Sequence, residues 1–429
     1  MKILDINNPG FRVEFEEILN RGKMDIEKVE GVVKSIINEV KNEGNKALFR
    51  HIAKFDKWEP RNDADLEIDK SEMKEAYDNL DDKLKEALHL AFDRIKAYHE
   101  KQLPKSWVDF EKNGTILGQK VTAVDRAGVY VPGGKAFYPS SLLMNVIPAL
   151  VAGVEEIVVT TPVIENKPNE LLLAALYICG MPKTYKVGGA SAIAAMAYGT
   201  QSIPKVDVIT GPGNIFVATA KKLVYGDVNI DMIAGPSEIG IIADSSAKPN
   251  FLAIDLLSQA EHDEMASSIL ITDSKEIADM TVIEIEKFLK TLEREEIARK
   301  SIEERGAVIV TNDIDEAIGL MNEIAPEHLE VVTSNPFELL PKIKHAGAIF
   351  LGEYTPEPIG DYIAGPNHTL PTGGSAKFFS PLNVEVFMKK SSIISFSKQA
   401  IEEMGEKCAV LAHTEMLTAH EKSVLERLK

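Results

Sequence analysis

Cysteine is almost absent from this chain. Among its 429 residues, Cys179 and Cys408 are the only two cysteines, and they form no C-x-x-C pair. Such sparse use fits a reducing compartment and gives no basis for a disulfide framework.

Long hydrophobic runs are absent too. The longest apolar stretch, residues 142–159, falls short of the roughly 20 apolar residues of a membrane span, because polar residues and a proline interrupt it (Asn145, Pro148, Glu155, Glu156). The first eleven residues contain Asp5, two Asn and Pro9 where a signal peptide needs an apolar core. We expect a cytoplasmic protein with no membrane partner.

Basic residues are fewer than acidic residues in this chain. The chain has 48 Lys and Arg against 66 Asp and Glu, which gives a net charge of -18. An acidic surface repels phosphate backbones, so a nucleic-acid partner is not expected. Hydrophobic residues at 45% and charged residues at 27% are ordinary for a globular protein. A chain of 429 residues is too long for one core, which favours two principal domains.

Two nucleotide-binding signatures are missing. The nearest approach to G-x-G-x-x-G is residues 211–216, where Phe216 stands in the place of the third glycine. Gly134–Lys135 lacks the leading glycine of a P-loop, since Val129 stands there, and no Ser or Thr follows the Lys. Several Gly-rich turns do follow short strands, where they either bind a pyrophosphate or only make tight turns.

Alternating strands and helices make up most of the chain. Apolar residues at helical spacing predict helices in the first 100 residues. From Val121 onward, short apolar strands alternate with helices, which is typical of open parallel sheets. The predicted fold is α/β, with two incomplete Rossmann-like domains, a helical N-terminal region and a small helical C-terminal tail.

The domain boundaries follow from this alternation. Residues 1–24 are expected to form an N-terminal arm. Residues 25–125 and 238–380 are expected to form a discontinuous α/β domain that carries the metal and catalytic motifs, interrupted by an α/β domain over residues 126–237. Residues 381–429 are expected to form the tail.

Metal-ligating side chains occur in three separate places. Gln259 and His262 lie three apart on a helix expected over residues 249–264, so they share a face, although a solvated helix face also explains them. Asp361 lies in a 15-residue loop, residues 360–374, with four Gly and two Pro, and such loops are usually functional. His420 follows Glu415 by five residues near the C-terminus. One Gln, two His and one Asp fit zinc, with manganese and cobalt as alternatives.

A possible acid–base pair stands between these ligands. Glu327 and His328 follow Pro326 at a junction between a loop and a strand. Adjacent carboxyl and imidazole groups supply two proton carriers with different intrinsic pKa values. A capped turn would be the alternative explanation.

Read together, these motifs resemble those of the histidinol dehydrogenases. The similarity runs from about Val121 to the end of the chain. Its motifs are S-Q-A-E-H-D (258–263), A-P-E-H-L-E (325–330), G-D-Y-x-A-G-P-N-H-x-L-P-T-G-G (360–374), E-x-x-x-x-H-x-x-S (415–423), G-V-Y-V-P-G-G (128–134), G-P-G-N (211–214) and A-G-P-S-E (234–238).

The resemblance implies a reaction and a site. Members oxidise L-histidinol through L-histidinal to L-histidine with two NAD, bind one zinc per site and form intertwined homodimers, in which the C-terminal Glu and His reach the partner's site. By position, the implied metal ligands, which also contact substrate, are Gln259, His262, Asp361 and His420. The other implied substrate contacts are Ser237, His328 and Glu415, and the implied NAD contacts are Tyr130, Ser191 and Asn214.

The resemblance also implies roles in catalysis. His328 would take the hydroxyl proton and Glu327 would activate water for the aldehyde step, with His368 in support. One residue departs from the family, which usually has G-G-A-Q-A where this chain has Gly188-Gly-Ala-Ser191-Ala. Ser191 is shorter than Gln, so the family's hydrogen bond to NAD would be lost, water-mediated or replaced.

Two other functions remain open from the sequence. A relative in the same superfamily could oxidise another small polar alcohol, such as a sulfonated diol, although Glu415 favours a cationic substrate. An inactive metal- or nucleotide-binding protein would be expected to have lost part of the ligand set or the Glu327–His328 pair, and both are present.

Overall fold

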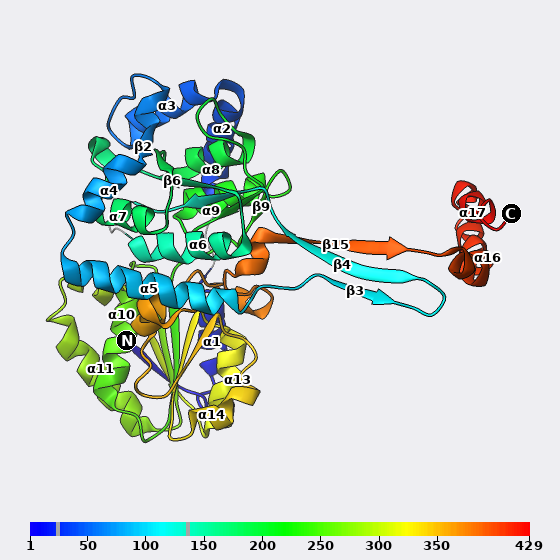
Figure 1. The fold of residues 1–429 in the computed structure, drawn as a ribbon. Helices are drawn as coiled ribbons and strands as arrows, with labels where there is room; N and C mark the ends of the chain where they lie inside the picture. Colours follow the sequence, from blue (N-terminus) through cyan, green and yellow to red (C-terminus); the bar gives the residue numbers. More distant parts are fainter. Residues whose placement is uncertain (23–25, 134–137) are drawn as a thin grey trace.

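The computed structural model describes residues 1–22, 26–133 and 138–429. Two α/β lobes lie one above the other, and a long three-stranded extension leads away from them to a terminal pair of helices (Figure 1). We call residues 26–100 and 126–230 the upper lobe, and residues 1–22 and 238–380 the lower lobe. Within the described part of the chain, no helix is long and apolar enough to cross a membrane.

The upper lobe is built on a six-stranded sheet. Its strands lie in the order β2 (Glu67–Asp69), β7 (Lys183–Lys186), β6 (Glu156–Thr161), β5 (Arg126–Tyr130), β8 (Val208–Thr210) and β9 (Asn229–Ile230). All neighbours pair in parallel except β2, which runs antiparallel to β7. Its crossover helices are α6 (Pro139–Ala152), α7 (Glu170–Ile178), α8 (Gly189–Tyr198) and α9 (Ile215–Val224).

The N-terminal helices belong to the upper lobe. They are α2 (Ile26–Glu43), α3 (Asn45–Phe55), α4 (Lys70–Asp78) and α5 (Asp82–Glu100). Helix α2 packs on α8 and α9, α4 on α7, and α5 on α6. Val33 and Val40 of α2 share one buried core with Ile193 and Ile209. The expected grouping of residues 25–125 with residues 238–380 is therefore wrong, because helical periodicity shows that a face is buried but not which sheet buries it.

The lower lobe is built on a second six-stranded sheet, which is parallel throughout. Its strands lie in the order β1 (Lys2–Asp5), β12 (Ala307–Val310), β11 (Ser267–Thr272), β10 (Glu238–Ala243), β13 (His328–Val332) and β14 (Ala348–Leu351). Its main helices are α1 (Phe11–Leu19), α10 (Pro249–Ala260), α11 (Lys275–Leu289), α12 (Glu295–Arg305) and α13 (Ile314–Ile324). The predicted arm over residues 1–24 is corrected here, since β1 is an edge strand of this sheet and α1 packs on α13.

The extension is an antiparallel sheet with helices at its tip. Its strands lie in the order β15 (Met388–Ser395), β4 (Ile116–Ala123) and β3 (Trp107–Phe110). Helices α16 (Lys398–Thr414) and α17 (Thr418–Leu425) follow β15. The C-terminal tail is therefore helical as predicted, but a strand that pairs with residues 116–123 precedes the helices.

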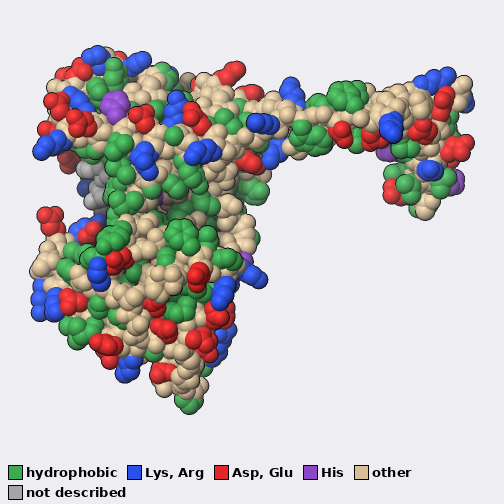
Figure 2. All heavy atoms as spheres, turned by 60° about the horizontal axis from the view of Figure 1, so that its bottom comes forward, with side chains coloured by type: hydrophobic (Ala, Val, Ile, Leu, Met, Phe, Trp, Pro, Cys, Tyr) green, Lys and Arg blue, Asp and Glu red, His purple; other side chains and the backbone are tan. Residues whose placement is uncertain are grey.

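Apolar side chains stay exposed along the extension. Phe110 is 72% exposed, Ile394 71% and Leu411 68%. Figure 2 shows the extension standing clear of the body, with hydrophobic side chains along its length. Exposed apolar surface of this extent is typical of a protein–protein contact.

The predicted fold class is confirmed. Both lobes are α/β units with largely parallel sheets, and the helical N-terminal and C-terminal regions are present. The candidate residues of the two lobes stand at opposite ends of their strands. His328 and Glu238 are the first residues of their strands, whereas Tyr130 is the last residue of β5.

Candidate active site between the two lobes

Glu327 and His328 stand at the amino-terminal edge of the lower sheet. Helix α13 ends at Ile324, and Ala325 adopts a left-handed conformation with φ of 50° that turns the chain into β13. Glu327 is 7% exposed and His328 is 3% exposed. The Oε2 atom of Glu327 accepts the Glu238 N–H at 2.9 Å and lies 3.7 Å from His328 Nδ1. The pair that the sequence predicts is therefore buried, and its two side chains lie next to each other.

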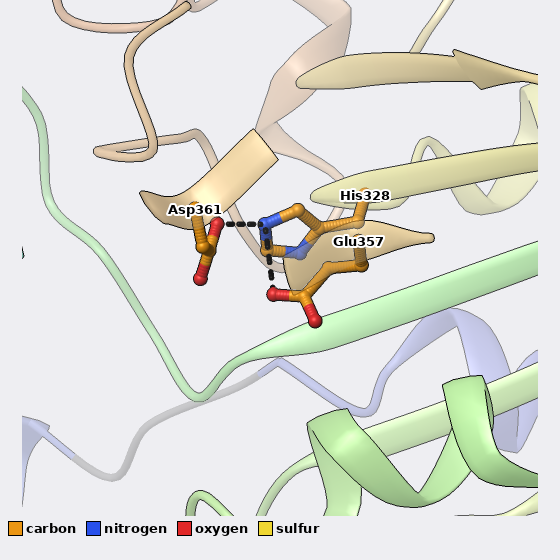
Figure 3. A group of neighbouring side chains, drawn as sticks. All are labelled: His328, Glu357 and Asp361. Atoms are coloured by element: carbon orange, nitrogen blue, oxygen red, sulfur yellow. Dashed lines mark ion pairs between the residues drawn. The ribbon is translucent and has the colours of Figure 1, made fainter. Parts of the chain in front are cut away.

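The hydrogen bond of His328 to the backbone fixes its neutral tautomer. His328 Nδ1 lies 3.0 Å from the Glu238 carbonyl oxygen. A carbonyl oxygen only accepts, so Nδ1 carries the proton and Nε2 keeps its lone pair in the neutral ring. Nε2 faces Asp361 Oδ1 at 3.4 Å and Glu357 Oε1 at 3.9 Å (Figure 3). The imidazole thus presents its basic nitrogen toward these carboxylates.

A tight helical turn brings Glu357 and Asp361 to His328. The short helix α15 (Glu357–Ile359) continues into a π-helical turn over Gly360–Ala364, a feature that is common at functional sites. A Cβ at Gly360 would lie 2.5 Å from a ring atom of Phe350, so glycine allows this close approach. One ligand atom from each of His328, Glu357 and Asp361 lies within 4.8 Å of the other two.

Sequence reasoning missed Glu357. Its flanking residues, Pro356 and Pro358, suggest a connector, although its spacing of four residues from Asp361 would place both carboxylates on one helical turn. Glu357 is 2% exposed, and its Oε2 accepts the Ser258 hydroxyl at 3.1 Å. Its Oε1 atom has no hydrogen-bond partner among residues 1–22, 26–133 and 138–429.

Gln259 and His262 lie close together as predicted, but they are not on one helix. Helix α10 ends at Ala260, short of the expected Glu264, so His262 lies in the turn that follows. The Met265 N–H donates to Asp263 at 2.9 Å, which stabilises this turn. Gln259 Nε2 lies 3.1 Å from His262 Nδ1, and within the described chain the buried Gln259 Oε1 has no hydrogen-bond partner. An unpartnered buried oxygen is costly unless a ligand uses it.

The titratable groups perturb one another strongly. Burial raises the pKa of Glu327 to about 8. Burial alone would lower the pKa of His328, but the surrounding carboxylates, Glu327 first, raise it well above its ordinary value. Burial also opposes charge on Asp361, but the contact with His328 holds its pKa well below the usual range. Burial and mutual contact therefore raise the proton affinity of Glu327 and His328 and lower that of Asp361.

His262 and His368 behave differently from His328. Burial lowers the pKa of His262, although the charge of Asp361 opposes the shift. Burial likewise lowers the pKa of His368. Both imidazoles are therefore neutral at pH 7, and a neutral imidazole is the form that binds a metal or accepts a hydrogen bond.

His368 connects the two lobes beside the site. Its Nδ1 lies 3.1 Å from the Asp361 carbonyl oxygen, and its Nε2 lies 3.3 Å from the Ser141 hydroxyl in the first turn of α6. From α5, Arg94 donates to the carbonyl oxygens of Ile363 at 2.6 Å and Ala364 at 3.2 Å. Contacts from the upper lobe thus hold the turn that carries Asp361.

An open cavity lies against these side chains. Its volume is about 1150 Å³. Among its lining residues are His328, Phe350, Asp361, Asn367, His368 and Tyr98. Ser237, a predicted substrate contact, is half-buried directly before β10 at the same edge of the sheet.

Two predicted site residues lie far from this group within one chain. Glu415 ends α16 and His420 lies in α17, and both are exposed at the tip of the extension (Figure 1). The structure of one chain therefore pairs Gln259 with His262 and His328 with Asp361, and the charges of Asp361 and His328 act on His262, whereas His420 lies in α17.

The predicted NAD contacts lie in the upper lobe, at the carboxyl-terminal edge of its sheet. Tyr130 ends β5 and accepts the Gly189 N–H at 3.3 Å, and Asn214 caps α9 through the Phe216 N–H at 3.1 Å. A Cβ at Gly211 would lie 2.0 Å from the Tyr130 carbonyl oxygen, so only glycine fits this turn. Gly134 and Lys135 lie outside the described residues.

Ser191 is turned away from this edge. It is 4% exposed, and its hydroxyl lies 2.9 Å from His51 Nδ1. His51 Nε2 in turn lies 3.2 Å from Glu39. The Ser191 side chain is thus engaged with helix α3 of its own lobe.

Comparison with known proteins connects this arrangement to a family. The family model described as histidinol dehydrogenase matches residues 19–428. A histidinol dehydrogenase of Sulfurimonas denitrificans is 70% identical over 421 residues, covering 98% of each chain. One of Wolinella succinogenes is 65% identical over 428 residues, covering 100% of this chain and 99% of its own. The crystal structure of histidinol dehydrogenase from Elizabethkingia anophelis superposes with a TM-score of 0.94 at 34% identity, covering 100% of this chain and 98% of its own. The chain therefore belongs to the histidinol dehydrogenase family of oxidoreductases.

Proposed function

We propose that this chain oxidises L-histidinol through L-histidinal to L-histidine, with NAD as the oxidant and one zinc ion per site. The observation that carries the proposal is the buried Glu327–His328 pair beside Asp361, with His328 Nε2 facing the carboxylate at 3.4 Å. The family membership supports the substrate, and the geometry supports an acid–base role for both side chains.

The residues present fit a zinc ion. Gln259 Oε1 has no partner within the described ranges, His262 is neutral at pH 7, and Asp361 is ionised. Oxygen and nitrogen donors without a thiolate suit zinc, and His420 of a second copy would complete the set. Bound zinc would orient the amino alcohol through its nitrogen atoms. Glu357 adds a buried carboxylate next to this group.

His328 would accept the alcohol proton in the first step. Its Nδ1–H donates to the Glu238 carbonyl oxygen, which leaves Nε2 free to receive a proton. The neighbouring carboxylates stabilise the resulting imidazolium, in agreement with the raised pKa of His328. NAD, bound along Tyr130 and Asn214 of the upper lobe, would supply the hydride acceptor.

Glu327 would activate water in the second step. A carboxylate whose pKa is about 8 is a stronger base than an ordinary glutamate, so it is suited to take a proton from water. The Glu238 N–H, 2.9 Å from Glu327 Oε2, holds it beside the imidazole. Separate groups thus serve the two oxidations.

The proposal includes a homodimer in the cytoplasm. The exposed apolar side chains of the extension and the distance of Glu415 and His420 from the rest of the site support the homodimer. Glu415 of one subunit would then bind the imidazole of substrate held by the other, as its negative charge favours a cationic ligand.

Counting NADH tests the function. Purified protein with limiting L-histidinol should form two NADH per substrate, and a chelator should abolish turnover. Formation of one NADH would mean that the aldehyde escapes. Turnover of a sulfonated diol with none of histidinol would overturn the substrate assignment, and full turnover in chelator would overturn the metal.

A further inference from the structure

Glu238 holds both members of the acid–base pair through its own peptide groups. Its N–H donates to Glu327 Oε2 at 2.9 Å, and its carbonyl oxygen accepts from His328 Nδ1 at 3.0 Å. One residue at the start of β10 therefore fixes the place of the carboxylate and the tautomer of the imidazole. Any movement of this peptide would shift both reacting groups.

The Glu238 side chain is anchored from the N-terminal segment. Arg21 Nη2 donates to Glu238 Oε2 at 2.8 Å, and the Gly373 N–H donates to Oε1 at 3.0 Å. The side chains of Arg21 and Glu238 are only 5% and 2% exposed. Each carboxylate oxygen of Glu238 thus accepts a hydrogen bond from a different donor, Arg21 or the Gly373 N–H.

Arg21 connects Glu238 to two helix ends. Its Nη1 donates to the Ile18 carbonyl oxygen and its Nη2 to the Ile324 carbonyl oxygen, both at 3.2 Å. These carbonyls belong to the last turns of α1 and α13, where a cation is favourable. Helix α13 leads directly into Glu327. Arg21 is therefore bonded both to Glu238 and to the helix that precedes the acid–base pair.

The path of the chain next to Arg21 is tightly constrained. A Cβ at Gly22 would lie 2.3 Å from the Gly373 Cα, so the backbones of these two glycines touch. From α12, Arg305 donates to the Arg21 carbonyl oxygen at 2.9 Å. Arg21 therefore approaches Glu238 from a fixed backbone rather than from a loose segment.

Stability alone is a weak explanation for such a pair. A buried ion pair often contributes no more than well-packed neutral residues of similar size, because both charges lose water. The contacts of Glu238 with both reacting side chains offer a different explanation. We propose that Arg21 and Glu238 are positioning residues, and that their ion pair holds the peptide that aligns Glu327 and His328. This inference rests on the proposed function of that pair.

Neutralising both partners tests the proposal. In the full-length protein, Arg21→Met combined with Glu238→Gln leaves no unpaired buried charge. We expect kcat with L-histidinol to fall about 10- to 100-fold, since small displacements of catalytic groups have effects of this size. The KM for histidinol should stay within about threefold and zinc content near wild type, because none of the changed atoms is a proposed metal or substrate contact. The melting temperature should stay near wild type, since replacing both partners of a buried ion pair by neutral residues is often neutral. Arg21→Lys, which keeps the charge with fewer contacts, should lose only about two- to fivefold in kcat.

The exposed pair of Arg12 and Glu323 is the matched control. Arg12 donates to Glu323 at 3.2 Å and so also connects α1 to α13, but at the surface. Arg12→Met with Glu323→Gln should leave kcat unchanged. Wild-type kcat in the Arg21/Glu238 double variant, or equal loss in the control, would overturn the proposal, as would a parallel loss of zinc and kcat.

A double variant that fails to fold leaves Arg21→Lys to decide. An intermediate kcat at a normal melting temperature would support positioning, and a wild-type kcat would overturn it. Turnover of the unaltered protein tests the proposed function separately, whereas the ratio of variant to wild-type kcat tests the positioning role.

Discussion

The two lobes present opposite ends of their helices to the site. In the upper lobe, α8 and α9 follow their strands and begin at the edge that carries Tyr130 and Asn214. In the lower lobe, α10 and α13 precede their strands and end at the edge that carries His328. Helix N-termini carry partial positive charge and C-termini partial negative charge. The upper edge therefore suits an anion such as a pyrophosphate, and the lower edge suits a metal ion or a protonated amine.

The side chains follow the same division. The candidate residues of the upper edge, Tyr130 and Asn214, are neutral, and glycine forms the turns between them. Apart from Gln259 and Ser237, those of the lower lobe are titratable and perturb one another's pKa values, and burial raises the pKa values of Glu327 and Glu357 to about 8. We propose that the upper lobe serves NAD binding and the lower lobe proton transfer. The following changes test this division, except the last, which tests a buried carboxyl of the upper lobe.

Removing a metal ligand should have the largest effect. His262→Asn should lose bound zinc and lower turnover by about a thousandfold, since a catalytic metal supplies several kcal/mol. Elemental analysis and NADH formation measure the two losses. NAD affinity, measured by calorimetry, should be unchanged because His262 belongs to the lower lobe. Weakened NAD binding in this variant would contradict the proposed division between the two lobes.

Removing the proposed water base should separate the two oxidations. Glu327→Gln should retain zinc and slow oxidation of added L-histidinal by about 10²- to 10³-fold, the usual contribution of a general base. Stoichiometry should move from two NADH toward one per histidinol. A metal-free Glu327→Gln protein would show that Glu327 acts as a ligand and not as a base.

A change in the upper edge should affect binding more than chemistry. Asn214→Ala removes the cap that accepts the Phe216 and Val217 N–H groups. The free energy of unfolding should fall by about 1 kcal/mol. The KM for NAD should rise by about tenfold while kcat stays within twofold, as expected when ground-state and transition-state binding are lost equally. Steady-state kinetics at saturating histidinol provide the measurement, and a fall in kcat alone would contradict the division.

The smallest effect concerns a carboxyl group of the upper lobe. Burial raises the pKa of Asp56 to about 7. A carboxyl whose pKa is raised by folding favours the folded state at low pH, and this advantage is lost as pH rises from about 4 through about 7. Asp56→Asn should therefore raise the melting temperature by about 2–4 °C at pH 8, and the gain should vanish near pH 4. The exposed Asp93→Asn is the control, and an equal gain at both pH values would contradict the assignment.

Local pattern predicted much of this molecule. The alternation after Val121 predicted both parallel sheets, whereas the grouping of Gln259, His262 and Asp361 was implied by the family resemblance and not by their spacing. The signals for the sheets lie within a few residues of the features they describe, either as a strand's apolar run or as a turn's glycines.

Long-range partners escaped prediction for a physical reason. Arg21 and Glu238 are 217 residues apart, and neither stands in a motif that suggests an ion pair. The helices of residues 26–100 display an apolar face, yet either sheet could have covered it. Glu357 was missed because it belongs to none of the motifs considered in the sequence, and the structure shows it at the start of a helical turn.

The extension has a genetic consequence if the proposed dimer forms. With His420 held on an arm outside the body that contains His328, each centre would draw on two gene copies. A chain carrying His328→Asn and a chain carrying His420→Asn would each be catalytically inactive alone. Expressed together, they would complement each other, because every mixed pair contains one centre built entirely from unaltered side chains.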